Sequence, residues 1–344
     1  MRAAQIFEHG GPEVLQLVEL PDPVAGPGEV LVCMTAASIN HLDLWVRRGM
    51  PGFPIAMPHI PGCDGTGVIA ALGEGVTDIA VGDRVVVLPG HSSGQSAHDR
   101  AGNDHLSDDY GIRGEHSSGV DCELAALERR YVMPLPAGVD PVEAAAVPLV
   151  FITAWGMLVE RAQLSAGETV LVLAGTSGVG SAAIQIALDR GARVITTAGS
   201  DAKRELCKQL GAHEVLDHHD VDWPKSVKRL TAGRGCDVVV EHVGPATWEG
   251  SMRSLARGGR LVTCGGTTGP KVCVLLPHLF MKNLSLLGST MGPARAFPAI
   301  FDGVARGAFK PVIDRVLPLA EVADAHRRLE AGEALGKIVL RIGD

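Results

Sequence analysis

The residues best suited to chemistry lie between positions 169 and 185, where an apolar strand-like run breaks into glycines and restarts as a helix. Gly175 and Gly178 allow the backbone to turn and approach a ligand, and Gly180 lets the helix start close to the strand. The N–H groups at that helix start would bind a pyrophosphate. The pattern predicts a dinucleotide cradle, with glycines that serve only packing as the alternative. The cradle residues are Gly175, Thr176, Ser177, Gly178, Val179 and Gly180.

A second strand-like run, residues 192–198, follows about 20 residues later, where a dinucleotide fold meets the adenosine ribose. An acidic residue at its end would favour NAD, but here Gly199 and Ser200 follow, with Lys203 and Arg204 one helical turn further on. A 2′-phosphate would therefore meet no negative charge and could meet cations. The sequence predicts NADPH as the cofactor, with NADH possible, since a solvated basic helix face would tolerate either.

Composition limits the class of protein. The 344 residues exceed the usual limit for one hydrophobic core, which predicts two domains. A formal net charge of −8 without basic clusters argues against nucleic acid and anionic membrane as partners. The first residues lack the apolar core of a signal peptide, and no run is long enough to span a membrane. We expect a cytoplasmic protein that acts on a small molecule.

The seven cysteines occur singly and without any Cys-x-x-Cys spacing. We expect them to be reduced and mostly buried. Unpaired spacing also argues against a cysteine-bound zinc ion. The cysteines are Cys33, Cys63, Cys122, Cys207, Cys236, Cys264 and Cys273.

The elements that must position these residues fall into two kinds. Residues 29–36, 67–72 and 83–88 are short β-leaning runs separated by Gly and Pro turns, which predicts a small barrel-like domain. From the helical run at 141–164 to about residue 290, strands and helices alternate, which is typical of a doubly wound parallel sheet. The closing strand at 337–341 is expected to return to the first domain, because the nucleotide sheet is already complete.

These segments together resemble the medium-chain dehydrogenase/reductase superfamily, and within it the zinc-free quinone oxidoreductase and enoyl reductase branch. The likeness covers the whole chain and rests on residues 1–4, 27–32, 40–43, 61–67, 81–85 and 336–340 together with the glycine turn. It implies an α/β protein with a GroES-like β-rich catalytic domain, residues 1–150 and 292–344. A Rossmann domain, residues 151–291, stands between these two parts.

The sequence departs from the zinc-dependent members at the catalytic metal. Where those members typically carry Cys, His and Cys, the matching positions here are Asn40, Cys63 and Leu149, with Asp64 beside Cys63. Zinc needs three protein ligands and an open position, which an amide and a leucine cannot supply. We therefore expect no catalytic zinc. An improvised set of Cys63, Asp64, His59 and His41 is the alternative.

The lobe at residues 90–121 departs in the same way. The family's four structural cysteines correspond to Ser93, Ser96, Asp99 and Ser107, and serine hydroxyls do not bind zinc usefully at neutral pH. We expect a degenerate lobe without metal. The alternative is a site made from the four histidines of the same segment, which are His91, His98, His105 and His116.

Without zinc, reduction of a conjugated C=C bond is less demanding than alcohol oxidation, because hydrogen bonds suffice to hold the developing enolate. The catalytic candidates are Asn40, His41 and Asp43. The Asn40 amide could donate to a substrate carbonyl or orient the nicotinamide, with a helix cap as the alternative. His41 could orient a ribose or pass a proton, with an ordinary hydrogen-bonded histidine as the alternative, and Asp43 is expected to support the site. The substrate pocket is assigned to Cys63, Asp64 and Leu149. Further cofactor candidates are Ser200 and Lys203 after the second strand and, by resemblance, Thr153, Cys264, Gly265 and Lys337.

The substrate class remains open among a short or branched enoyl-CoA, an enone and a quinone. A CoA thioester would need cations, for which Arg47, Arg48, Arg113 and Lys282 are available. An alcohol dehydrogenase with atypical metal ligands and a non-catalytic NADPH-binding protein are the alternatives. We also expect a homodimer, because residues 284–288 form an apolar strand that would otherwise be an exposed sheet edge.

Overall fold

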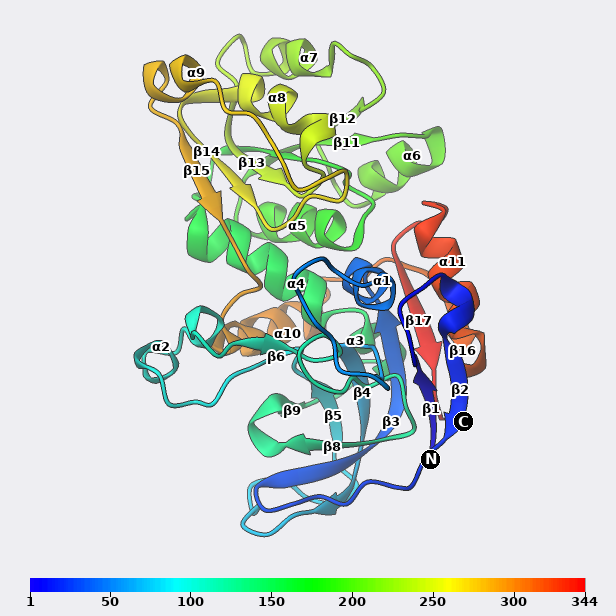
Figure 1. Cartoon of the computed structure of the whole chain (residues 1–344). Helices are drawn as coiled ribbons and strands as arrows, with labels where there is room; N and C mark the ends of the chain where they lie inside the picture. Colours follow the sequence, from blue (N-terminus) through cyan, green and yellow to red (C-terminus); the bar gives the residue numbers. More distant parts are fainter. Residues whose placement is uncertain (344) are drawn as a thin grey trace. The chain divides into compact units, whose positions relative to one another are not determined.

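The computed structural model describes residues 1–343 and divides the chain into two units. Unit 1 comprises residues 1–149 and 293–344, and unit 2 comprises residues 150–292. Each unit has its own sheet and is described separately (Figure 1). Among residues 1–343 no helix is long and apolar enough to cross a membrane.

Unit 1 is built on a seven-stranded sheet with the order β16-β17-β3-β4-β5-β9, to which β8 adds by pairing with β3. Two small antiparallel pairs, β1 with β2 and β6 with β7, complete its strands. The strands are β1 (Arg2–Gln5), β2 (Gln16–Glu19), β3 (Glu29–Ile39), β4 (Asp64–Leu72), β5 (Arg84–Val87), β6 (Gly90–His91), β7 (Gly111–Ile112), β8 (Leu124–Glu128), β9 (Val132–Pro134), β16 (Ile313–Pro318) and β17 (Lys337–Arg341). The helices are α1 (His41–Arg48), α2 (Ala97–Arg100), α3 (Pro141–Ala145), α10 (Phe297–Ala305) and α11 (Val322–Glu330).

Strand β3 organises this sheet. Its side chains alternate between buried and less buried up to Met34, as expected for a strand with one face on a core. Gly67 of β4 passes so close to β3 that a Cβ there would lie less than 3.0 Å from the Cys33 carbonyl oxygen. Glycine is needed at this position for that close approach.

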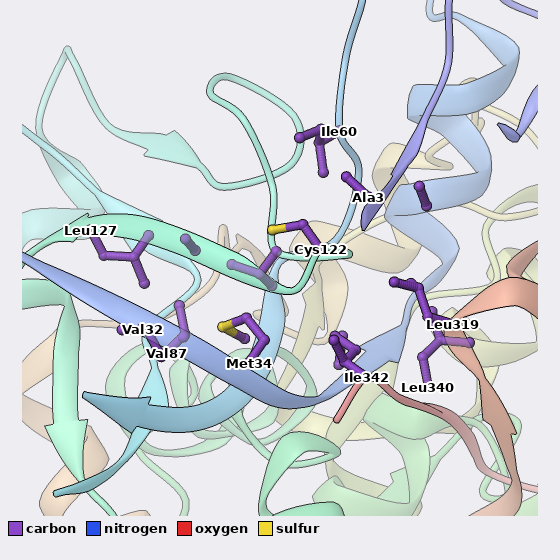
Figure 2. Packing of buried hydrophobic residues seen from close by; sticks show 14 of the residues in the cluster. Ala3, Val32, Met34, Ile60, Val87, Cys122, Leu127, Leu319, Leu340 and Ile342 are labelled. Carbon is purple, nitrogen blue, oxygen red and sulfur yellow. The ribbon is translucent and has the colours of Figure 1, made fainter. Parts of the chain in front are cut away.

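The core of unit 1 joins the two ends of the chain. Figure 2 shows Val32 and Met34 of β3 in one apolar cluster with Leu340 of β17, and with Ala3 and Ile342. The closing strand therefore belongs to the first domain, as the sequence predicted. This packing fixes the position of Lys337, the first residue of β17.

Unit 2 is a six-stranded parallel sheet with the order β12-β11-β10-β13-β14-β15. Figure 1 shows α5 and α6 on one face of this sheet and α7 and α8 on the other, as in a doubly wound fold. Helix α4 (Pro148–Trp155) continues as a π-helical turn (Gly156–Arg161) at the start of the unit. The other elements are β10 (Thr169–Val172), α5 (Gly178–Asp189), β11 (Arg193–Ala198), α6 (Asp201–Gln209), β12 (Glu214–Asp217), α7 (Trp223–Leu230), β13 (Cys236–Glu241), α8 (Pro245–Ser254), β14 (Leu255–Thr263), α9 (Leu276–Met281) and β15 (Ser285–Gly288).

Candidate functional site

Three neighbouring strands of unit 1 bring the candidate active-site residues together. Strand β17 pairs with β3 so that Ile338 lies opposite Ile39, and β4 pairs with β3 so that Asp64 lies opposite Ser38. The ends of these strands therefore converge at the start of α1. The side chains that meet there are Asn40, Cys63, Asp64 and Lys337, all of them at most 5% exposed.

Lys337 is the cation of this cluster. Its ammonium donates to the Ile39 carbonyl oxygen at 2.8 Å and to the Asn40 side-chain oxygen, and it lies 3.4 Å from Oδ2 of Asp64. The sequence interpretation assigned Lys337 to cofactor binding. In the structure it is a member of the Asn40 cluster, and a contact with the cofactor stays a prediction.

Asn40 occupies the N-cap position of α1 with an extended backbone. Its side-chain nitrogen lies 2.9 Å from Oδ2 of Asp64, 3.2 Å from the Ser38 carbonyl oxygen and 3.3 Å from the Cys63 sulfur. An amide nitrogen has only two hydrogens, so both are directed at acceptors within the protein. This geometry makes Asn40 a positioning residue for Lys337 and Asp64. Donation by its amide to a substrate carbonyl stays a prediction.

Asp64 is fully buried and well partnered. Besides Asn40 and Lys337, its carboxylate accepts the Leu149 main-chain N–H at 2.8 Å. Burial raises the pKa of Asp64, and the Lys337 charge opposes that rise. Leu149 thus contacts the cluster through its main-chain N–H. A comparison of side-chain types with the zinc-dependent members could not show this contact. Burial also raises the pKa of the Cys63 thiol well above its usual value, so this thiol stays protonated.

Two further carboxyl groups, those of Asp43 and Asp121, lie beside this cluster and next to Gly62. Asp43 accepts the Asn40 main-chain N–H at 2.6 Å, and burial raises the pKa of Asp43 to about 6. A Cβ on Gly62 would lie less than 3.0 Å from Asp121, whose pKa is raised well above its usual value by burial and then by Asp43. Both oxygens of Asp121 are buried without a hydrogen-bond partner among residues 1–343. Burial without a hydrogen-bond partner therefore favours the protonated form of Asp121.

The cluster does not fit a catalytic zinc ion. The Asn40 amide is engaged with Asp64 and Lys337, Leu149 contributes only its main-chain N–H, and Cys63 is the one thiol of the cluster. Zinc prefers thiolate, imidazole or carboxylate around an open position. Of the improvised set, His59 instead bonds the Gly114 carbonyl oxygen at 2.9 Å, and His41 is exposed at the start of α1. Among residues 1–343 no three His, Cys, Asp or Glu side chains form a group that could hold a metal ion.

In the 90–121 lobe, hydrogen bonds link the residues that match metal ligands in the zinc members. The Asp99 carboxylate accepts from the hydroxyls of Ser92 at 2.6 Å and Ser107 at 3.3 Å, and from the Ser96 main-chain N–H at 2.8 Å. These bonds, led by that of Ser92, lower the pKa of Asp99 to about 2. Ser93 instead donates its main-chain N–H to Asp109 at 3.0 Å.

The lobe histidines have separate environments. His91 lies 3.0 Å from the Ser117 hydroxyl, and burial lowers its pKa to about 4. His116 accepts the Ile112 main-chain N–H at 3.1 Å and lies 4.8 Å, edge to face, from the ring of Phe53. His91 and His116 are thus held by different neighbours. The alternative of a shared histidine metal site gains no support from this arrangement.

In unit 2, the glycine turn connects β10 to α5 as the sequence predicted. Ser177 caps the helix, because its hydroxyl accepts the Gly180 N–H at 3.0 Å. The N–H groups of Gly178 and Val179 precede the first intrahelical bonds and are left to bind an external anion. The turn therefore fits the pyrophosphate of a dinucleotide.

Gly175 has a packing role in the structure. A Cβ on Gly175 would lie less than 3.0 Å from the Thr196 hydroxyl and the Cys207 sulfur. Its missing side chain thus allows the turn to pack against β11 and α6. The expectation that Gly175 also gives a ligand room stays a prediction.

The remaining cofactor candidates lie at the carboxyl edge of the same sheet or on α4. Ser200 caps α6, with its hydroxyl 3.3 Å from the Lys203 N–H, and Arg204 pairs with Asp201 at 2.6 Å and Asp217 at 2.9 Å. Cys264 and Gly265 follow β14, and Thr153 is buried on α4. Arg204 is thus committed to carboxylates, which weakens its predicted role at a 2′-phosphate.

The sequence interpretation missed Glu241 at the end of β13. Glu241 is fully buried, and its carboxylate accepts the main-chain N–H groups of Val243 at 2.7 Å and Gly244 at 3.0 Å and the Ser251 hydroxyl at 2.6 Å. It therefore fixes the loop that follows β13 at the carboxyl edge of the sheet. The sequence did carry a signal for this residue, because Glu241 is an acidic residue at the end of an otherwise apolar strand.

The cations proposed for a CoA thioester are not free. Arg47 is fully buried and pairs with Glu330 at 2.9 Å, and Arg48 pairs with the same carboxylate. Arg113 is 8% exposed, and Lys282 bonds the Leu255 carbonyl oxygen at 3.2 Å. Arg47 and Arg113 are thus removed from the surface by burial, which corrects the expectation that all four are available to a CoA thioester.

Comparison with known proteins agrees with this architecture. Residues 26–137 match the family described as alcohol dehydrogenase GroES-like domain, and residues 178–306 match zinc-binding dehydrogenase. The quinone oxidoreductase of Homo sapiens is 30% identical over 346 residues, which cover 99% of this chain and 97% of the relative. That of Pseudomonas aeruginosa is 33% identical and covers 98% of each chain.

Solved structures give the same fold. A structure described as an NAD-dependent alcohol dehydrogenase is 45% identical, covers 100% of both chains and has a TM-score of 0.96. A cobalt- and zinc-bound thermostable alcohol dehydrogenase from Pyrobaculum aerophilum is 34% identical, covers 99% of both and has a TM-score of 0.90. A crotonyl-CoA carboxylase/reductase in complex with NADP is 26% identical, covers 99% of this chain and 95% of the other, and has a TM-score of 0.91.

The chain belongs to the medium-chain dehydrogenase/reductase superfamily. Within it, the chain falls in the quinone oxidoreductase-like branch and is an NAD(P)H oxidoreductase. This confirms the predicted fold, with a GroES-like domain and a Rossmann domain.

Proposed function

We propose that this protein is an NAD(P)H-dependent reductase of a conjugated C=C bond in an enoyl-CoA, an enone or a quinone, and that it works without zinc. The observation that carries the proposal is the buried Lys337 ammonium, which binds Asn40 and Asp64 where a metal-dependent relative needs metal ligands. A site organised by an ammonium and an amide lacks the donor set for a zinc-bound alkoxide.

The chemistry follows from what such a site still offers. The nicotinamide supplies a hydride when the cofactor is bound. Gly178 and Val179 would hold the pyrophosphate through their N–H groups. The Lys337 side chain lies beside Asn40 and Asp64, and burial favours the protonated form of Asp121 in the same buried region. Conjugate reduction needs hydrogen bonds to a developing enolate and one proton, which is less than alkoxide formation demands.

Alcohol oxidation is a second candidate function, because the 45% identical structure is described as an NAD-dependent alcohol dehydrogenase. That description favours NAD and an alcohol. Against it, the end of β11 carries no acidic residue to bond a ribose hydroxyl, since Ala198 is followed by Gly199 and Ser200. We therefore propose NADPH as the preferred cofactor.

The test is a substrate panel on metal-stripped protein. NADPH and NADH oxidation would be followed with crotonyl-CoA, an aliphatic enone and a benzoquinone. NADP⁺ and NAD⁺ reduction would be followed with primary and secondary alcohols. The proposal expects turnover of at least one conjugated acceptor, unchanged by EDTA, and none of the alcohols. Alcohol oxidation that appears only when zinc is added would establish the second candidate instead.

We also propose a homodimer formed along β15, which is the edge strand of the unit 2 sheet. Exposed apolar side chains of the 272–281 segment precede this strand, among them Leu276, Phe280 and Met281, each more than 60% exposed. Phe280→Asp should shift the molar mass measured by light scattering from dimer to monomer. Val221→Asp, at a 91% exposed site, is the control. A monomeric parent protein would contradict this proposal.

A further inference from the structure

Two adjacent histidines follow β12 and converge on one point of unit 2. The rings of His218 and His219 lie edge to face, with centroids 4.5 Å apart and an interplanar angle of 72°. A Cβ built on Gly199 would lie less than 3.0 Å from the Nε2 atom of each ring. Two imidazole nitrogens thus approach the same backbone atom, and only the missing side chain of Gly199 leaves them room.

This point lies where a dinucleotide fold meets the adenosine ribose. Strands β11 and β12 are parallel neighbours with Ala198 opposite Asp217, so the residues after each strand lie side by side. Gly199 and Ser200 follow β11 and lead into α6, and the histidines follow β12. The ribose of a bound dinucleotide is expected at the end of the second strand of the unit.

The charges around the histidine pair set the pKa of His218. Burial and the nearby charge of His219 lower the pKa of His218, Asp217 raises it, and Lys203 and Arg204 lower it further. Arg204 is itself neutralised by its pairs with Asp201 and Asp217. His218 is therefore uncharged at neutral pH. An anion bound beside it would favour protonation of its ring.

We propose that His218 and His219, with the Ser200 hydroxyl and Lys203, recognise the 2′-phosphate of NADPH, and that this histidine pair strengthens the preference for NADPH over NADH as pH falls. The inference rests on the proposed cofactor preference and extends it to a named, pH-sensitive recognition site. A phosphate dianion beside an imidazole favours the protonated ring, so binding of NADPH takes up a proton. NADH carries a hydroxyl at the same position and has no such effect.

The experiment is a binding measurement that needs no turnover. Dissociation constants of NADPH, NADH and adenosine 2′,5′-bisphosphate would be measured by calorimetry at about pH 8 and about pH 6.5. NADPH and the bisphosphate should bind about fivefold more tightly at the lower pH, while NADH changes less than about twofold. Calorimetry in buffers of different ionisation enthalpy should show proton uptake with NADPH and the bisphosphate, and none with NADH.

Variants separate the pair from its surroundings. His218→Gln/His219→Gln should weaken NADPH binding at least about tenfold at the lower pH, remove the pH dependence and leave NADH unchanged. Gly199→Ala should act in the same direction, because its methyl group would displace both rings. His278→Gln on α9 is the control, and thermal melting would verify that each variant is folded.

Equal pH dependence in the parent and the double variant would overturn the inference, as would an unchanged NADPH-to-NADH ratio. The outcome is distinct from that of the substrate panel. If the protein selects NADPH through the histidine pair but reduces no conjugated bond, the inference holds and the proposed function fails. If it reduces a conjugated bond but binds NADPH independently of the pair, the proposed function holds and the inference fails.

Discussion

The ammonium of Lys337 lies 3.4 Å from the Asp64 carboxylate, and the two side chains are 5% and 0% exposed. They come from opposite ends of the chain and meet because β17 and β4 flank β3. A buried charge pair of this kind is costly to break, because removing one partner leaves the other charged in a dry environment.

Lys337→Met should lower the free energy of unfolding by about 3 kcal/mol, since Asp64 would lose its counter-charge. Adding Asp64→Asn should recover part of that loss. Urea denaturation of the two single variants and the double variant forms the cycle. Arg253→Ala, which breaks an exposed pair with Glu249, should cost under about 1 kcal/mol. Strictly additive losses at Lys337 and Asp64 would show that the pair has no coupling.

Asn40→Ala should lower kcat at least about tenfold, because Lys337 and Asp64 would lose the amide that positions them. The Asn40 amide also lowers the pKa of Asp64, so its removal should move the acidic limb of the kcat profile to higher pH. The measurement is steady-state turnover across pH with the best acceptor of the panel. Asn103→Ala in the lobe is the matched control, and an unshifted profile with normal kcat would leave Asn40 as a helix cap only.

Asp121→Asn should stabilise the protein at about pH 8 by about 1 kcal/mol or more. The folded protein holds a proton on Asp121 well above the ordinary pKa of an aspartate, whereas the unfolded chain releases it near 3.8. Stability is therefore lost as pH rises between these values. The asparagine is neutral throughout and should remove that loss, measured by denaturation at several pH values. Asp324→Asn, from an exposed pair, should change nothing. A destabilised Asp121→Asn at high pH would contradict the assignment of a proton.

The local parts of this fold were predictable and the long-range ones were not. The glycine turn and most Rossmann strands are visible in short runs of sequence, although β12 was not named because its four residues are only half-buried. Asp121 was missed because its place depends on main-chain bonds between residues 119–121 and 60–62. The contacts of Lys337 with Asn40 and Asp64 were missed for the same reason, since the β17–β3 register decides its neighbours. The burial of Arg47 was also missed, because it depends on contacts with His326 and Glu330 of the distant helix α11.

Acid should destabilise the protein through His326. Burial and the Arg47 charge lower the pKa of His326 to about 3, while the unfolded value is 6.5. Stability from the neutral ring is complete above pH 6.5 and is lost as pH falls from there toward about 3. In His326→Leu, the loss of unfolding free energy between about pH 7 and about pH 5 should be smaller by about 2 kcal/mol than in the parent. An identical pH slope in both proteins would refute this, with His278→Gln as the control.

The most direct test of zinc-independent conjugate reduction combines metal analysis with turnover on one sample. Protein stripped with EDTA and verified by elemental analysis would be assayed with NADPH and the panel of conjugated acceptors, then with zinc restored. The account predicts full turnover of a conjugated acceptor in the metal-free sample, no gain on adding zinc, and no oxidation of alcohols. Turnover that is lost with the metal and returns with zinc would contradict it.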